Sequence, residues 1–419
     1  MRRLSRPLVQ PVLKWSVVAG LCLCGAGGSA FADTVKIGCL YPLTGPGGLY
    51  GRDSAIAIEM ALEDLANSDQ GPYPKLDITI EDTRSKTLRS LQIARQFIEE
   101  DDVDFLCGVV SSSIAMAVTD VVKDTDVFFI GTDHASPSLT SYALHPNYFR
   151  VSNGSRQSML AGAQYIERHF DTSDAPLRIA FIGPDYEYGY QSWDDLQAFL
   201  GQNGVAYEVA GTYWPKLFET DFSSYIDAIN AQAPDIIVNG HWGLDLVTFI
   251  RQANQTALFE TSEFMNFDAG GNFEVLAELG NEMPLGIVLS ARHHNTWPYT
   301  LQNTEFVTRF QAQAGRYPSY AAQGAYAGVK VIAEAVKKAG GAGDPNALRA
   351  ALQTTEISLP EDPAGFKSKM DPMHHQMLQV QAIGRTVFNT SFAPAKVQLG
   401  NWEVFYPPAA WPDLDRAPQ

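Results

Sequence analysis

The amino-acid sequence predicts an α/β protein built from two doubly wound parallel-sheet lobes. Short β-rich runs alternate with segments of helical period, which is typical of parallel sheets covered by helices. The alternation starts afresh after Tyr148-Phe149-Arg150. A chain of 419 residues also exceeds what one hydrophobic core usually holds, so the second series predicts a second lobe.

The first series begins with a strand and a helix that packs one face onto the sheet. In that helix Ile58, Leu62 and Leu65 fall at i, i+4 and i+7 and form one apolar face. We expect strands at 35–40, 76–81, 105–110 and 127–130, and helices at 53–67, 87–100 and 114–123. In the second series we expect strands at 178–182, 207–213, 235–239, 263–265 and 286–290, and helices at 191–200, 223–231, 244–252, 304–313 and 320–338.

Residues 1–32 have the three parts of a secretory signal peptide. Basic residues come first, an apolar run at 15–23 follows, and Ala30-Phe31-Ala32 places small residues at the cleavage positions. The apolar run is far shorter than the roughly 20 residues of a membrane-spanning helix. We therefore expect cleavage before Asp33, export to the periplasm, and a mature chain without stable membrane insertion.

The composition is that of an ordinary globular protein, with 45% hydrophobic and 18% charged residues. The formal net charge is -17, and loss of the basic leader makes it more negative. Such a charge repels nucleic acid and anionic lipid, so we expect neither as a partner. Cys39 and Cys107 lie in apolar runs, where we expect buried free thiols. A disulfide between them is the alternative, but a bridge directly across paired strands strains the preferred geometry.

Ligands of open parallel sheets bind beyond the carboxyl ends of the strands, so the loops at those ends are the candidate sites. The first such loop spans residues 44–51 and is rich in glycine. It lacks the third glycine of the dinucleotide fingerprint and the lysine of a phosphate-binding loop, so we expect no nucleotide cofactor. Tyr50 in this loop either caps the sheet or faces a ligand.

The next two loops favour a carboxylate ligand. Ser111, Ser112 and Ser113 precede the helix at 114–123, where hydroxyl groups and unpaired N–H groups meet the positive end of the helix dipole. The loop at 131–137 has Ser136 as an N-cap and Pro137 at the first helical position. We expect this third loop to contact the ligand mainly through its backbone.

Several motifs, in this order, resemble the periplasmic leucine/isoleucine/valine-binding proteins. They are Thr44-Gly45-Pro46 with Tyr50-Gly51, the serine run, Tyr186-Glu187-Tyr188-Gly189, and Arg251-Gln252-Ala253 after Asn239-Gly240. The resemblance implies a type I periplasmic binding protein of the Venus-flytrap kind, whose two lobes close around a small solute. It also implies delivery of that solute to an inner-membrane ABC permease.

The resemblance assigns binding roles in the first lobe to the second and third loops. Ser112 matches the serine that binds the ligand's α-carboxylate, with Ser111 in that role if the register shifts by one. Asp133 matches a backbone carbonyl that receives the ammonium, and Ala135 matches a second carboxylate contact. The family commonly has threonine at the position of Ala135, so only the N–H of Ala135 is left for this contact, unless Ser136 takes the role.

Four further positions complete the implied site. Tyr50 matches a tyrosine that touches the ligand, and Trp242 matches a second-lobe tyrosine after a glycine turn. Asp268 matches the acid that pairs with the ammonium, and as an alternative it is an exposed turn residue. Tyr188 is either an aromatic wall of the site or a packing residue.

The resemblance also implies which segments form each lobe. The first lobe comprises 33–150 with 292–358, and the second comprises 151–291 with 359–419. Three crossovers join them, near Val151, near Ala291 and around Pro360.

The residues that suggest catalysis or metal binding are few. No serine lies in a glycine-flanked nucleophile elbow, the motif His-Glu-x-x-His is absent, and adjacent histidine pairs do not converge on one metal. We therefore expect no enzyme, no cofactor and no metal. The favoured function is binding of a small amino acid, branched-chain or related. The alternatives are a carrier of amides, urea or aromatic and other carboxylic acids, and a ligand-sensing module without transport.

Overall fold

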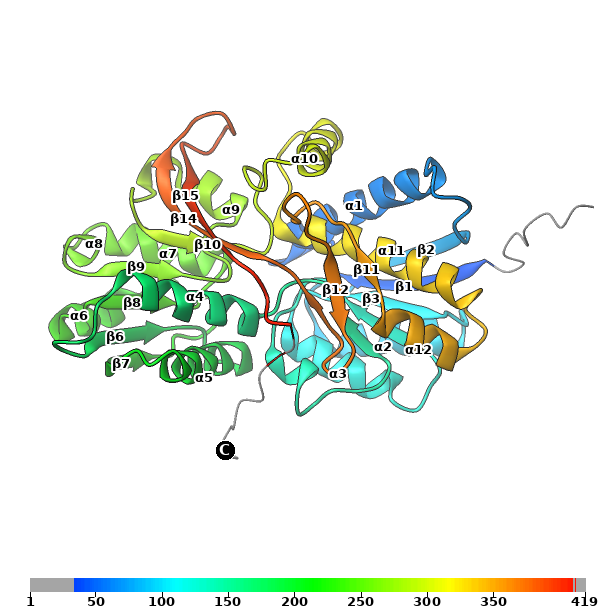
Figure 1. Cartoon of the computed structure of the whole chain (residues 1–419), viewed down its shortest axis with the longest axis horizontal. Helices are drawn as coiled ribbons and strands as arrows, with labels where there is room; N and C mark the ends of the chain where they lie inside the picture. The colour runs from blue at the N-terminus through cyan, green and yellow to red at the C-terminus, as the bar shows by residue number, and fades with distance from the viewer. Residues whose placement is uncertain (1–33, 410, 412–419) are drawn as a thin grey trace, which may run out of the picture.

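The computed structural model describes residues 34–409 and 411, and two sheets organise them (Figure 1). The predicted signal peptide lies outside the described residues. The two doubly wound α/β lobes are confirmed. Among the helices of the described residues, none has the length and apolar character that a membrane span requires.

The first sheet has the strand order β11-β12-β13-β5-β4-β3-β1-β2. Its parallel part follows the predicted alternation: β1 (Val35–Tyr41), β2 (Leu76–Asp82), β3 (Phe105–Gly108), β4 (Phe128–Gly131) and β5 (Tyr148–Arg150). Three short strands from late in the chain extend it: β11 (Glu356–Ile357), β12 (Ser368–Asp371) and β13 (Gln376–Leu378).

Helices cover both faces of the first sheet, and the buried side chains of its central strands are divided between two hydrophobic clusters. One face packs against α1 (Gly48–Ala66), α10 (Leu301–Ala314), α11 (Tyr320–Ala339) and α12 (Pro345–Gln353). The other face packs against α2 (Thr87–Glu99) and α3 (Ser112–Val122). The predicted apolar face of the first helix is present, with Ile58 and Leu65 buried and Leu62 packed against the same cluster.

The second sheet repeats this arrangement in the order β15-β14-β10-β9-β8-β6-β7. Its strands are β6 (Leu177–Ile182), β7 (Tyr207–Tyr213), β8 (Ile236–Asn239), β9 (Glu263–Asn266), β10 (Val288–Ser290), β14 (Gln381–Phe388) and β15 (Val397–Phe405). One face carries α4 (Ser155–His169) and α5 (Glu187–Gln202). The other carries α6 (Ser223–Gln232), α7 (Gly243–Ala253), α8 (Leu258–Thr261) and α9 (Phe273–Leu279).

Three crossovers join the lobes, and the third lies later than predicted. The first two follow β5 and β10, near Val151 and Ala291 as expected. The third follows β13, because β12 and β13 pair in the first sheet and only β14 belongs to the second. The expected crossover around Pro360 is therefore wrong, and residues 359–378 complete the first sheet. Strands of two to four residues carry too little periodicity to show which sheet they join.

Cys39 and Cys107 form a disulfide, which corrects the expectation of free thiols. The two residues are direct partners in the parallel pairing of β1 with β3, and their side chains lie in the same hydrophobic cluster. Their Cα atoms are 4.5 Å apart, which lies within the range that a disulfide spans. Sequence spacing does not reveal such a pairing register, so the bridge was not predictable from the positions of the cysteines.

Two helices begin earlier than their apolar period predicted. Helix α1 begins at Gly48 and α5 begins at Glu187, so Tyr50 and Tyr188 lie in the first turns of helices and not in loops. Glycine allows α1 to start close to the sheet, because a Cβ atom at Gly51 would lie 2.1 Å from the carbonyl oxygen of Pro42. Both first turns face the space between the lobes, since Tyr50 donates to Glu274 of the second lobe and Glu187 accepts from Ser136 of the first.

Candidate functional site

The second and third strand-end loops of the first lobe are tied together by a hydrogen bond. The backbone N–H of Ser136 donates to Oγ of Ser112 at 3.2 Å. Ser136 caps the short 3-10 helix at Pro137–Thr140 as predicted, since its Oγ accepts from the N–H of Ser138. Ser111 occupies the N-cap position of α3, and Ser112 is buried at its first turn. The hydroxyl group of Ser112, as a donor, remains available to a ligand.

The hydroxyl group of Ser136 reaches across to the second lobe. It donates to Oε1 of Glu187 at 2.5 Å, and the hydroxyl of Ser138 donates to the same oxygen. Glu187 is the first residue of α5, where the N-terminal end of a helix stabilises a carboxylate. Ser136 therefore contributes to lobe closure through its side chain, and its backbone holds Ser112.

A small cavity between the lobes, which we call the inner pocket, brings several predicted residues together. Its polar wall is made by residues of the first lobe: Val110, Ser112, His134 and Ala135. Its other wall holds four aromatic side chains and one cation: Tyr186, Tyr188, Trp242, Tyr320 and Arg292. The cavity volume is about 20 Å³, which is room for one water molecule, so the two walls must separate to admit a solute.

The backbone N–H of Ala135 is an unpaired donor in this pocket. Ala135 is 2% exposed, and its N–H has no hydrogen-bond acceptor among the described residues. Its carbonyl oxygen accepts from the N–H of Ser155. A buried donor without a partner is costly, so the position suits an acceptor oxygen on a ligand. That Ala135 contacts the ligand through this N–H stays a prediction.

The aromatic wall is held by contacts among its own members. Trp242 Nε1 donates to the hydroxyl oxygen of Tyr186 at 3.2 Å, and the rings of Tyr186 and Tyr188 stack with centroids 5.8 Å apart. The ring of Tyr320, from the first turn of α11, enters from the first lobe. Trp242 and Tyr188, which the sequence placed at the candidate site, both line the inner pocket.

Asp268 is buried and already paired with a cation. Arg292 donates to its two oxygens, from Nη2 at 2.6 Å and from Nε at 3.1 Å. Tyr188 and Ser158 donate to it through their hydroxyl groups at 2.7 and 2.8 Å. Burial opposes ionisation, but the charge of Arg292 and these donors outweigh it and lower the pKa of Asp268. The alternative of an exposed turn residue is excluded, and the acid is neutralised within the chain.

Arg292 is a candidate site residue that the sequence did not single out. It directly follows Ala291 after β10, at the same carboxyl edge of the sheet as the other candidate loops. Applying the strand-end rule to this strand as well would have found it. The carbonyl oxygen of Asp133 accepts from Nη1 of Arg292, so Arg292 joins both lobes. The side chain of Asp133 is fully buried, and burial raises its pKa to about 7 although the charge of Arg292 opposes this.

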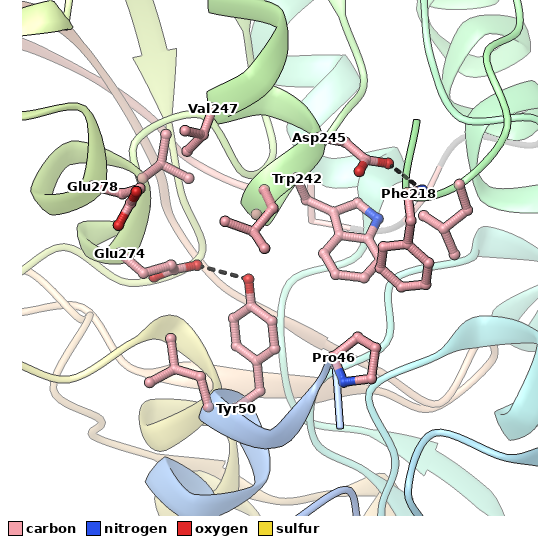
Figure 2. Close-up of a pocket in the computed structure, with 13 residues that line it drawn as sticks. Pro46, Tyr50, Phe218, Trp242, Asp245, Val247, Glu274 and Glu278 are labelled. Atoms are coloured by element: carbon pink, nitrogen blue, oxygen red, sulfur yellow. Dashed lines mark hydrogen bonds between the residues drawn. The ribbon is translucent and has the colours of Figure 1, made fainter. Parts of the chain in front are cut away.

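A second cavity, which we call the outer pocket, lies on the other side of Trp242 and has a volume of about 250 Å³ (Figure 2). Pro46, Leu49 and Tyr50 line it from the first lobe, and side chains of α7 and α9 line it from the second. The hydroxyl of Tyr50 donates to Oε1 of Glu274 at 3.0 Å, across the two lobes. Tyr50 therefore closes the outer edge of the cleft, next to Trp242, and lines the outer pocket.

The contact between Tyr50 and Glu274 predicts that lobe closure depends on pH. Burial raises the pKa of Glu274 to about 7, whereas an exposed glutamate titrates near 4.3. Closing the lobes thus takes up a proton, and closure should weaken as the pH rises from about 4.5 to 7 and then level off. Small-angle X-ray scattering of the protein at pH 5 and pH 8 measures this as a larger radius of gyration at pH 8.

Two variants identify the group responsible. Glu274→Gln should reduce the pH dependence, because glutamine does not titrate and still accepts from Tyr50, while Asp133, whose pKa burial also raises to about 7, keeps its own contribution. Glu278→Gln changes an exposed acid that lines the same pocket, and this variant should keep the dependence. A radius that is equal at both pH values in the unmodified protein contradicts the expectation.

Comparisons with known proteins agree with this architecture. A family model described as periplasmic binding protein matches residues 34–386. The leucine-, isoleucine-, valine-, threonine-, and alanine-binding protein of Pseudomonas aeruginosa is 25% identical over 354 residues, which are 84% of this chain and 91% of that protein.

Two solved structures share the fold of nearly the whole chain. A solute-binding protein of an ABC transporter from Rhodopseudomonas palustris HaA2, in complex with p-hydroxybenzoic acid, has a TM-score of 0.77 at 20% identity. The match covers 90% of this chain and 98% of that one. An amino acid ABC transporter substrate-binding protein from Pseudomonas fluorescens Pf-5 has a TM-score of 0.77 at 21% identity, and the match covers 91% and 98% of the two chains.

Proposed function

Because this chain belongs to the periplasmic binding protein family, it is a solute-binding protein and not an enzyme, and we propose that its solute is a small carboxylate. The solute binds between the lobes, in the inner pocket, and the closed protein delivers it to an inner-membrane ABC permease. Closure couples the two steps, since only the closed form brings contacts from both lobes to the ligand.

The observation that carries the proposal is the group of donors that converge on the inner pocket. The N–H of Ala135, the hydroxyl of Ser112 and the guanidinium of Arg292 line the same small cavity. Hydrogen bonds to a charged group are the stronger kind, each contributing about 1.5–3 kcal/mol. Micromolar binding needs about -8 kcal/mol, and three such bonds with the apolar contact of the aromatic wall bring it within reach.

Two classes of solute carry such a carboxylate. Amino acids are favoured by the name of the relative in Pseudomonas aeruginosa, and aromatic acids are favoured by the ligand of the structure from Rhodopseudomonas palustris. Both place a carboxylate next to an apolar group, which fits a polar wall that faces an aromatic wall.

Ligand-dependent melting tests the proposal. A bound solute raises the melting temperature by mass action, so screening the purified protein against amino acids, aromatic acids and amides identifies the class. Ser112→Ala should weaken binding of the identified solute by about 10-fold, because it removes one hydrogen bond to a charged group. Ser113→Ala, an exposed neighbour on α3, is the control and should bind like the unmodified protein. The proposal fails if no carboxylate shifts the melting temperature.

The delivery step and the periplasmic location distinguish a transport protein from a ligand-sensing module of the same fold. Release of the protein from intact cells by osmotic shock tests the location. The solute-loaded protein should stimulate ATP hydrolysis by its permease in membrane vesicles, whereas a sensor would leave the hydrolysis rate unchanged.

A further inference from the structure

Arg292 occupies the two groups that the family resemblance assigns to the ammonium of an amino acid. Its Nε and Nη2 donate to Asp268, and its Nη1 donates to the carbonyl oxygen of Asp133. These are the acidic group and the backbone carbonyl that were expected to receive the ligand's positive charge. A side chain of the protein, 7% exposed, already fills that role.

The side chains that line the inner pocket offer a ligand a positive charge and no negative one, while the carboxyl groups of Asp268 and Asp133 lie outside the lining, 2.6 and 3.8 Å from Arg292. Arg292 is the only ionised side chain among the described residues that line it. His134 also lines it and is neutral, because burial lowers its pKa to about 3. An ammonium group in this pocket would lose its hydration and lie beside the guanidinium without a counter-ion, and both effects oppose binding.

We propose that the solute is an aromatic carboxylic acid without an α-ammonium group, and that Arg292 supplies the charge which an amino acid would bring. This inference rests on the proposed function and narrows its solute. Three of the five N–H groups of Arg292 donate to Asp268 and Asp133, which leaves two for a carboxylate. In the occupied site, Arg292 contributes one positive charge, and Asp268 and the solute contribute one negative charge each. The net charge is therefore the same as for a zwitterionic amino acid bound beside a single acid.

The remaining wall of the pocket selects a flat ring. The guanidinium of Arg292 lies over the ring of Tyr320, 4.8 Å from its centroid, so the cation packs on an aromatic face. Tyr186, Tyr188 and Trp242 add three more rings. Aromatic rings pair favourably in stacked and edge-to-face arrangements, so an aromatic solute gains contact with several of these faces at once.

Matched ligand pairs test the inference on the unmodified protein. L-phenylalanine differs from 3-phenylpropanoate only by its α-ammonium group, and L-leucine differs from 4-methylpentanoate in the same way. Isothermal titration should show that each deaminated acid binds at least about 10-fold more tightly than its amino acid, the ratio expected for one unpaired charge. Within the acids, 3-phenylpropanoate should bind more tightly than 4-methylpentanoate.

The outcomes separate the inference from the function on which it rests. Tighter binding of the amino acids overturns the inference and leaves the solute-binding function intact. Tighter binding of 4-methylpentanoate overturns the aromatic part alone. Binding of neither acids nor amino acids overturns both the inference and the proposed carboxylate site.

Variants of Arg292 test its role directly. Arg292→Ala frees Asp268 and the carbonyl of Asp133, so the preference should reverse in favour of L-phenylalanine. Because this change leaves a buried acid unpaired, the double variant Arg292→Met with Asp268→Asn provides a folded comparison without either charge. The double variant should lose at least about 10-fold in affinity for 3-phenylpropanoate and gain none for L-phenylalanine.

A matched control comes from another paired arginine. Arg309 pairs with Asp64 and Glu63 in the first lobe, away from the inner pocket. Arg309→Ala should therefore prefer 3-phenylpropanoate over L-phenylalanine as the unmodified protein does. If Arg292→Ala and the double variant keep that preference as well, Arg292 does not supply the charge and the proposal is wrong.

Discussion

Gly324→Ala is expected to destabilise the protein and to weaken solute binding. Gly324 lies in α11, where a Cβ atom would be 1.8 Å from the carbonyl oxygen of Thr132. Thr132 immediately precedes Asp133 in the strand-end loop that supplies Ala135 and Ser136. Since backbone atoms on both sides make the contact, α11 or the loop must move, and overpacking of this kind costs about 1–3 kcal/mol or more.

Differential scanning calorimetry and titration measure both effects of Gly324→Ala. A loss of this size lowers the melting temperature by about 2–4 °C for each kcal/mol in domains of 150–250 residues. The displaced loop carries the N–H of Ala135, so the affinity for the solute should fall in parallel.

Gly201→Ala is the matched control for this prediction. Gly201 also lies in a helix, α5, but a Cβ atom there meets no atom within 4 Å. Alanine favours a helix by about 1 kcal/mol over glycine, so this variant should be neutral or slightly more stable. If Gly324→Ala melts at the temperature of the unmodified protein, the close approach of α11 to the loop is absent in solution.

Removal of the disulfide is expected to destabilise the first lobe. The bridge closes a loop of 68 residues, for which the loss of chain entropy in the unfolded state corresponds to about 4 kcal/mol. The double variant Cys39→Ala with Cys107→Ala removes it with little change in the hydrophobic cluster around β1 and β3. Urea unfolding should show a lower midpoint for this variant.

A reducing buffer provides the comparison for the disulfide. The unmodified protein in reductant keeps every side-chain atom and should unfold at a midpoint close to that of the double variant. The disulfide contributes no stability if oxidised and reduced protein share one midpoint.

The regular alternation of strands and helices made the two lobes predictable. Apolar period identifies elements such as α1 and β4, because their burial depends on local spacing. It does not reveal that β13, three residues long, joins the first sheet, since that depends on pairing with β5 far away in the sequence. The disulfide was missed for the same reason, because the register of β1 with β3 is a tertiary property.

The candidate site was predictable where it follows the ends of strands. Ser112, Ala135, Tyr188 and Trp242 line the inner pocket, as the loop rule and the family resemblance indicated. The partners of charged groups were not predictable, because a sequence shows that Asp268 is acidic and does not show which cation reaches it. Because Arg292 pairs with Asp268, we propose an acid as the solute and not a zwitterionic amino acid.

Arg292 belongs to the second of the three crossovers, the stretch that leaves β10 and leads to α10. A solute bound to this guanidinium would contact one of the segments that join the lobes, in addition to the surfaces that face each other across the cleft. Substitutions at Arg292 should therefore change the affinity for the solute and the closure of the lobes together.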